Sequence, residues 1–217
     1  MKLYYVVGSP NSRKVHAVIN HLGIKVDIEY LDFFAGELKK PDYLGLNPNG
    51  MVPTLRDGDF LLWESNAIMQ YLAAKAPPST LFPKDEKTRV DITRWQCWEL
   101  AHYNKAFGTL SFETVAKPNF LNAPPDEGVV TWATRELTRY APTLEAHLKG
   151  RNYLVGNDVT LADYSVIHVE AFKEGVPFDW SPFPNINAYY ERMRAVPHWA
   201  KTAPSSPQAI GRRPKAA

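Results

Sequence analysis

The chain has 217 residues, of which 45% are hydrophobic and 22% charged, as expected of a globular protein with a substantial core. The formal net charge of +2, with no basic stripe interleaved with aromatics, argues against a dedicated nucleic-acid-binding protein. The single cysteine, Cys97, excludes an internal disulfide framework, and no apolar run approaches the ~18 residues of a membrane span. The first residues also form too short an apolar run for a signal peptide, so we expect a cytoplasmic protein.

The N-terminal part combines strand and helix signals. Residues 2–7 predict a buried strand, apolar residues at helical spacing then predict a helix that ends at Gly23, and residues 26–30 alternate as a second strand. A hairpin follows over residues 52–63, and a helix over residues 65–74. This βαβ plus ββα order predicts a thioredoxin-like α/β domain.

A proline-rich stretch then separates two kinds of pattern. We interpret residues 77–85 as a linker, because strand signals nearly vanish after it. Residues 86–115 predict a long helical stretch that Pro118 and the Asn122–Pro125 cluster interrupt. Residues 127–148 predict a second one, with a kink or break at Pro142 inside it.

The remaining residues predict further helices and a tail. One helix begins at Thr160, which Asp163 helps to cap, and another covers about residues 185–196. Residues 86–200 therefore predict an all-helical domain. Residues 201–217 form a basic, proline-containing tail that we expect to be loose and solvated, the alternative being a lid over a substrate pocket.

Two residue pairs, Val52-Pro53 and Glu64-Ser65, carry the strongest functional signal. A proline at a strand start, if its peptide bond is cis, turns the backbone N–H and C=O of Val52 outward, where an extended peptide can pair with them. Cis bonds occur at only ~5% of X–Pro positions, so this prediction depends on the context. At the predicted helix start, the free N–H groups and Ser65 suit a carboxylate, and Glu64 suits an ammonium. One small zwitterionic peptide would use all of these groups.

These pairs resemble the glutathione-binding half of the glutathione S-transferase family. The opening Lys2–Val15 also resembles that family's first strand, catalytic loop and first helix, and Gly150–Tyr164 resembles the loop and capping element of its helical domain. The three motifs occur in order and at the expected spacings, so the resemblance covers nearly the whole chain.

The resemblance implies an organisation and a set of partners. Residues 1–76 would be the thioredoxin-like glutathione-binding domain, and residues 86–200 an all-helical domain that forms the pocket for a small hydrophobic electrophile. The implied co-substrate is glutathione, the implied assembly is a homodimer, and the implied role is detoxification. No metal, nucleic acid or membrane is expected as a partner.

The candidate catalytic residues lie in the loop after the first strand. Glutathione carries its own thiol, and a hydrogen-bond donor beside a helix N-terminus favours the thiolate. Ser9 is our first choice because it precedes Arg13 as in serine-type members, while Ser9-Pro10-Asn11 also resembles the loop of nu-class members, where the Asn approaches the sulfur. Asn11 is therefore the second choice and Ser12 the third. The alternative is that these side chains only cap the helix and shape a turn.

Lys39 and Met51 complete the predicted glutathione contacts. Lys39, with Lys40 beside it, is a candidate for the glycine carboxylate of glutathione; the alternative is a solvated lysine pair. Family members often carry a basic residue near the x-Pro pair, but this chain has Gly50 and Met51 there, which removes a charge contact. The predicted binding set is thus Lys39, Met51, Val52, Pro53, Glu64 and Ser65.

Four aromatic residues are candidates for the electrophile pocket: Trp98, His102, Tyr103 and Phe107. Aromatics at helical spacing are more often core residues, which is the alternative. His102 has no second ligand at i+4, so a metal site is not expected. Cys97, between tryptophans in the middle of a helix, is expected to be a buried structural thiol.

The leading interpretation is a glutathione transferase that binds glutathione, stabilises its thiolate and conjugates it to a hydrophobic electrophile. Two alternatives stay open: a glutathione-dependent disulfide-bond reductase, suggested by Ser9-Pro10-Asn11, and a non-catalytic binding module, suggested by the missing charge at Gly50-Met51.

Overall fold

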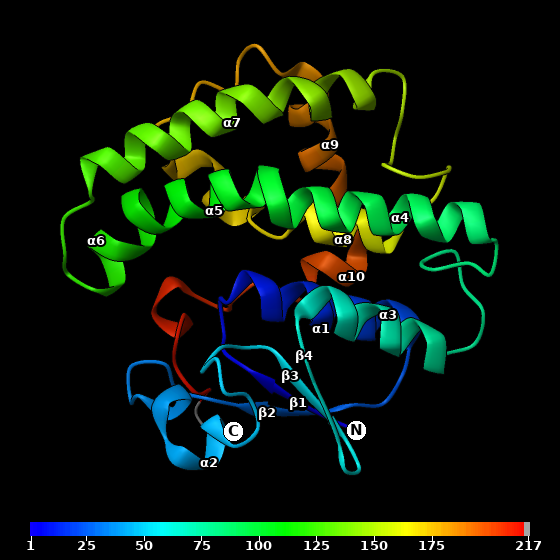
Figure 1. Cartoon of the computed structure of the whole chain (residues 1–217), viewed down its shortest axis with the longest axis vertical. Coiled ribbons are helices and arrows are strands. Elements are labelled where there is room, and N and C mark those ends of the chain that lie inside the picture. Colours follow the sequence, from blue (N-terminus) through cyan, green and yellow to red (C-terminus); the bar gives the residue numbers. More distant parts are fainter. Residues whose placement is uncertain (215–217) are drawn as a thin grey trace. The chain divides into compact units, whose positions relative to one another are not determined.

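The computed structural model describes residues 1–214, which form two compact units (Figure 1). The sheet unit contains residues 1–82 together with the segment from Val196 onward, and the helical unit contains Pro83–Ala195. The division between Phe82 and Pro83 falls within the stretch interpreted as a linker.

The sheet unit is built on a four-stranded mixed sheet. Its order is β2-β1-β3-β4, with β1 parallel to β2 and the other pairs antiparallel. The predicted thioredoxin-like layout is confirmed. The strands are β1 Lys2–Tyr5, β2 Asp27–Tyr30, β3 Thr54–Asp57 and β4 Phe60–Trp63.

Helices cover both faces of this sheet. Helices α1 (Pro10–Leu22) and α3 (Ser65–Lys75) lie side by side on one face (Figure 1), and their apolar residues are buried against alternate strand residues such as Leu3 and Leu55. Helix α1 ends where predicted, at Gly23, whose φ of 63° suits a residue without a Cβ. On the other face lie the 3-10 helix η1 (Glu37–Lys39) and α2 (Pro41–Leu44).

The helical unit contains only helices as regular elements, as predicted. The α-helices are α4 Glu86–Trp98, α5 Asn104–Ser111, α6 Lys117–Phe120, α7 Glu127–Leu148, α8 Leu161–Ile167 and α9 Pro184–Arg194. Between them lie two π-helical turns, η2 Glu99–Tyr103 and η3 Phe112–Ala116, and the 3-10 helix η4 Glu170–Gly175. No described helix is both long enough and apolar enough to cross a bilayer.

Pro118 and Pro142 disturb their helices less than predicted. The helical run from α4 continues through η3 into α6, and Pro118 lies in the first turn of α6, directly after the π-helical turn η3. Helix α7 is not broken at Pro142. Its fully buried stripe, which includes Leu137, Ala141 and Leu144, continues on both sides of the proline, and this burial outweighs the one hydrogen bond that Pro142 cannot donate.

The predicted loose tail is wrong for the described residues 201–214. After α10 (Pro197–Ala200), the chain packs on the sheet unit and contains a 3-10 helix, η5 (Pro207–Ala209). Gly211 donates to the Val7 carbonyl at 2.8 Å and accepts from the Phe33 amide at 2.7 Å. Arg213 pairs with Glu37 at 3.0 Å, although the basic composition of the tail predicts a solvated side chain. Residues 215–217 of the predicted tail lie outside the described residues.

Candidate functional site

A cavity of about 190 Å³ lies within the sheet unit, where β3 and α3 begin. Among the candidate residues it brings together Asn11, Met51, Val52-Pro53 and Glu64-Ser65. The remaining lining residues, Asn47, Asn49 and Trp63, were not in the predicted set. Ser9, Ser12 and Lys39 do not line it.

The Val52–Pro53 peptide bond is cis, as predicted. Within residues 1–214, the backbone N–H and C=O of Val52 form no hydrogen bond, while Thr54 already belongs to β3. Val52 thus presents one donor and one acceptor at the cavity, as an unpaired strand edge does.

A buried polar network holds the loop before this proline. The Asn47 side-chain amide donates to the Met51 carbonyl at 2.9 Å and to the Thr54 hydroxyl at 3.1 Å, and its oxygen accepts from the Asn49 amide at 3.0 Å. Tyr43 reaches the same Met51 carbonyl through its hydroxyl. Asn47 is 2% exposed, so it is a positioning residue of this loop; its place in Asn47-Pro48-Asn49-Gly50, a turn-type run, is the signal that would have singled it out.

Glu64 and Ser65 meet the cavity at the start of α3. Glu64 has a φ of 72°, a left-handed conformation that costs a non-glycine residue of order 1–3 kcal/mol and that is concentrated at ligand sites. The first turn of α3 begins at buried Ser65 and directs N–H groups without helical partners toward the cavity side. The Ser65 hydroxyl donates to Asn11 Oδ1 at 3.2 Å, which links α3 to the first turn of α1.

The three catalytic candidates, predicted in a loop, lie at the start of α1: Ser9 precedes the helix, and Asn11 and Ser12 are in its first turn. Ser9 is the N-cap of α1, and its oxygen accepts from the Ser12 amide at 3.3 Å, so its own hydroxyl hydrogen is free to be donated. Asn11 accepts from Ser65 and keeps its side-chain NH₂ as a donor. Ser12 is fully buried, with no hydrogen-bond partner for its hydroxyl among the described residues.

The two remaining predicted contacts are exposed. Met51 lines the cavity with 65% of its surface accessible. Lys39 is exposed at the end of η1, outside the cavity lining.

In the helical unit, the aromatic candidates separate into core and surface. Tyr103 and Phe107 are fully buried, and the hydroxyls of Tyr103 and Tyr190 lie 2.8 Å apart, so this pair belongs to the core. Trp98 is half-buried and lines a cavity of about 230 Å³ with Arg94, Trp95, Thr143 and His147. Among residues 1–214, no group of three or more His, Cys, Asp and Glu side chains is arranged to hold a metal.

Cys97 is exposed, so the expectation of a buried thiol is wrong. Its flanking residues explain the error. Trp95, two residues earlier, faces the core at 5% exposure, and a helix turns about 100° per residue, which carries Cys97 away from that face.

Comparison with known proteins decides the family. The family description "Glutathione S-transferase, N-terminal domain" matches residues 8–75, and "Glutathione S-transferase, C-terminal domain" matches residues 106–197. A probable glutathione S-transferase of Oryza sativa subsp. japonica is 34% identical over 205 residues, which is 94% of this chain and 95% of the relative. The chain belongs to the glutathione S-transferase family.

Solved structures of other transferases have the same fold. Glutathione transferase F7 from Populus trichocarpa has a TM-score of 0.84 and 26% identity, covering 93% of this chain and 96% of its own. A glutathione S-transferase I bound with lactoylglutathione has a TM-score of 0.81 and 29% identity, covering 93% and 97%. The predicted fold, the transferase activity and glutathione as co-substrate are thereby confirmed.

Proposed function

We propose that this transferase binds glutathione in extended form at the cavity between Val52 and α3. The backbone of Val52 pairs with the cysteinyl residue of glutathione, Ser65 and the first turn of α3 hold the γ-glutamyl carboxylate, and Glu64 receives its ammonium. The proposal is supported by one observation above all: an unpaired backbone donor and acceptor at Val52 share a single small cavity with a carboxylate and a helix N-terminus.

The thiol of glutathione would then be activated from the start of α1. Ser9, the N-cap, donates its free hydroxyl hydrogen to the sulfur and so favours the thiolate, while Asn11 in the first turn completes the wall on that side. Asn11 rather than Ser9 lines the cavity, and this favours the second candidate, in which Asn11 contacts the sulfur and the enzyme also reduces glutathione-linked disulfides. Ser12 contributes by burial behind the loop, not by contact.

The other partners follow from the same proposal. Lys39, exposed and on the element that precedes α2, attracts the glycine carboxylate through solvent. Met51, exposed at the cavity, contacts glutathione without contributing a charge. The second substrate is a small hydrophobic electrophile, attacked by the bound thiolate, in a detoxification role. We assign the enzyme to the cytoplasm, where its one exposed thiol stays reduced.

We further propose a homodimer, in keeping with the family resemblance. Met69, which is fully buried, and Trp95, at 5% exposure, have too little accessible surface to contribute to an interface. Trp63 and Phe60 on β4, at 41% and 48% exposure, remain available. Light scattering at micromolar concentration should give twice the monomer mass, and charge substitution at Phe60 should reduce that mass to the monomer value.

Calorimetric and thermal-shift titrations with glutathione test the proposal. Binding to the folded state alone stabilises it by about 2.7 kcal/mol at a hundredfold excess over Kd, so Tm should rise with glutathione concentration. A Tm that stays constant up to millimolar glutathione would remove the basis of the proposed site. Parallel assays with an aromatic chloride and with hydroxyethyl disulfide separate conjugation from disulfide reduction.

A further inference from the structure

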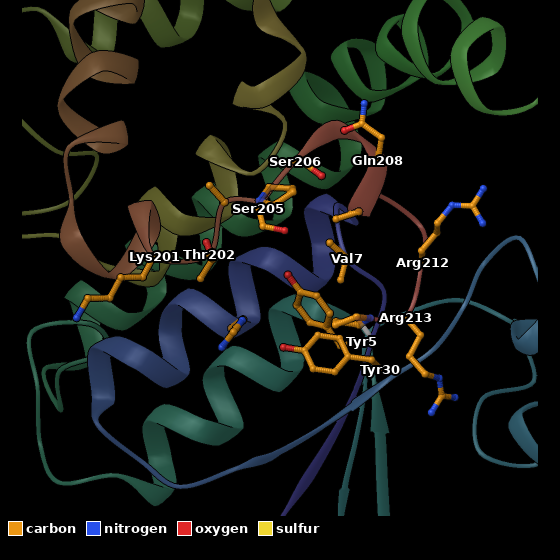
Figure 2. Close-up of a pocket in the computed structure, with 15 residues that line it drawn as sticks. Tyr5, Val7, Tyr30, Lys201, Thr202, Ser205, Ser206, Gln208, Arg212 and Arg213 are labelled. Atoms are coloured by element: carbon orange, nitrogen blue, oxygen red, sulfur yellow. The ribbon is translucent and has the colours of Figure 1, made fainter. Parts of the chain in front are cut away.

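The C-terminal segment, residues 201–214, runs past the loop that follows β1 (Figure 2). Most of its residues line one side of a cavity of about 560 Å³, and the other side is formed mainly by Tyr5 and other residues of β1, α1 and β2. Ile210 and Gly211 do not line this cavity. They contact the loop after β1 instead, so these two residues join the segment to that loop.

This loop is a tight turn of four residues, from Val6 to Ser9. The Ser9 amide donates to the Val6 carbonyl at 3.1 Å, and Gly8, the third residue of the turn, has a φ of 81°. Both features match a type II turn, which requires a positive φ at its third position. Type I and type II turns differ by a rotation of the central peptide, here between Val7 and Gly8, through roughly 180°. Glycine adopts the φ of either type, so the turn by itself has little preference between them.

Gly211 makes the hydrogen bond that orients this central peptide. Its amide donates to the Val7 carbonyl at 2.8 Å, whereas the Gly8 N–H forms no hydrogen bond within residues 1–214. The carbonyl is therefore turned toward the C-terminal segment, and the N–H, on the opposite side of a trans peptide, is turned away from it. Gly211 is fixed in turn, because its carbonyl accepts from the Phe33 amide at 2.7 Å and a Cβ on it would lie 2.6 Å from the Phe34 ring.

Ile210 packs against the same face of the turn. A Cβ built on Gly8 would lie 2.7, 3.0 and 3.1 Å from the Cγ2, Cγ1 and Cβ atoms of Ile210. The isoleucine side chain thus lies directly against Gly8, next to the hydrogen bond between Gly211 and Val7. One hydrogen bond and one packing contact from the C-terminal segment together favour the type II state of the turn.

We propose that Ile210 and Gly211 are positioning residues for the activation of the thiol. By holding the turn, they fix the peptide dipole next to Ser9 and the direction of the Ser9 hydroxyl. This role rests on the proposed function, in which Ser9 donates to the glutathione sulfur. Neither Ile210 nor Gly211 lines the cavity at Val52, so neither helps to hold the glutathione backbone. Loss of their contacts should therefore weaken thiol ionisation and leave peptide binding intact.

Two substitutions at Ile210 test the packing contact. Valine keeps the three atoms that lie nearest to Gly8, whereas alanine keeps only Cβ. Ile210→Ala should raise the pH at which bound glutathione ionises by about one unit, as read from the ultraviolet absorbance of the thiolate, and Ile210→Val should behave as the parent. Gln208→Ala, at an exposed position of the same segment, is the control and should leave this pH unchanged.

S-methylglutathione measures peptide binding separately, because it has no thiol to ionise. Its Kd, from calorimetry, should be the same in the parent and in Ile210→Ala. Absence of S-methylglutathione binding to the parent would remove the proposed glutathione site itself. Unchanged binding together with an unchanged ionisation pH in Ile210→Ala would instead count against the role of Ile210.

A backbone substitution tests the hydrogen bond. Replacement of Gly211 by glycolic acid, through ligation of a synthetic C-terminal segment, removes the N–H that donates to Val7 and adds no side chain. The ionisation pH should rise relative to the ligated chain that contains Gly211. In the Ser9→Ala background, Ile210→Ala should cause no further rise, because both changes remove the same interaction. An ionisation pH that is unchanged in both Ile210→Ala and the ester chain, or a rise in Ile210→Ala that persists without Ser9, would overturn the proposal.

Discussion

The amide of Gly211 donates a 2.8 Å hydrogen bond to the carbonyl of Val7, and this bond fastens the C-terminal segment to the loop that follows β1. Next to it, Gly8 has a φ of 81°, and a Cβ there would lie 2.7 Å from a side-chain methyl of Ile210. Ser9, the proposed thiol-activating residue, follows directly. The start of α1 is therefore held partly by residues about two hundred positions later in the chain.

Gly8→Ala should destabilise the enzyme more than Gly23→Ala. Both substitutions force a left-handed alanine, at about 1–2 kcal/mol, but only Gly8 also creates an overlap, for which a further ~1–3 kcal/mol is typical. Urea unfolding measures both. Adding Ile210→Ala to Gly8→Ala should recover the stability lost to the overlap but not the stability lost to the backbone conformation. A double-mutant cycle measures this coupling. Equal losses of unfolding free energy in Gly8→Ala and Gly23→Ala would show that Ile210 does not overlap a side chain at position 8.

Ser9→Ala should raise the pH at which bound glutathione ionises, with a modest effect on its affinity. A hydrogen bond to a charged group contributes about 1.5–3 kcal/mol, and one pKa unit corresponds to about 1.4 kcal/mol, so a shift of about one to two units is expected. The ultraviolet absorbance of the thiolate reports it directly. Asn11→Ala and Ser12→Ala are the matched comparisons. If Asn11→Ala moves the midpoint and Ser9→Ala does not, Asn11 is the donor and the disulfide-reductase alternative gains.

Ser65→Ala should raise KM for glutathione about tenfold and leave kcat nearly unchanged. On binding, the hydroxyl would exchange its hydrogen bond to Asn11 for one to a carboxylate remote from the sulfur, so its loss removes binding that the ground and transition states share. Steady-state kinetics at varied glutathione concentration give both constants. Ser79→Ala, at a position outside the cavity lining, is the control. A fall in kcat at constant KM would contradict the assignment of Ser65 to the carboxylate.

Asp163 should make folding stability depend on pH. Burial raises the pKa of this carboxyl to about 6, even though the Leu154 and Thr160 amides donate to it at 2.9 and 2.8 Å. The unfolded value is about 3.9, so between pH 4 and 6 the folded state binds a proton that the unfolded state lacks. This contribution to stability is present below pH 4 and falls by roughly 3 kcal/mol as the pH rises through 6.

Asp163→Asn removes that titration and is the direct comparison. The stability advantage of the parent over the variant, measured by urea unfolding from pH 4 to 7, should therefore shrink as the pH rises. An advantage that grows over the same interval would mean that the hydrogen bonds to the carboxylate outweigh its burial.

Cys97 should react with one equivalent of a maleimide in the folded enzyme. It is the single cysteine of the sequence and is exposed on α4. Mass spectrometry should show one adduct in native buffer and none in Cys97→Ser. The labelling rate should be the same with and without S-hexylglutathione, which has no free thiol, because Cys97 does not line the cavity at Val52. Labelling only after unfolding would instead show that the thiol is buried, as the sequence suggested.

Local patterns account for most of what the sequence predicted. The helical spacing that ends at Gly23, the hairpin within residues 52–63 and the cis Val52–Pro53 bond all depend on neighbouring residues, and the structure confirms each. The same local reasoning placed Glu64 and Ser65 at the start of a helix, where they lie.

The incorrect predictions concern positions whose structure depends on residues far away in the sequence. Arg213 stays bound because of Glu37, and Gly211 because of Val7 and Phe33, partners about 180–200 positions away that tail composition cannot reveal. The exposure of Cys97 depends on which face of α4 the rest of the helical unit covers.

The sheet unit is assembled from two stretches of chain that the whole helical unit separates in sequence. During synthesis from the N-terminus, residues 1–82 leave the ribosome long before residues 196–214 exist. Until then Val7 and Phe33 lack the partner that Gly211 supplies, and the cavity beside Tyr5 has only one wall. The nascent enzyme therefore completes its first domain last. Early termination after the helical unit would leave the segments that match the family, but the loop after β1 would lack the support of Gly211.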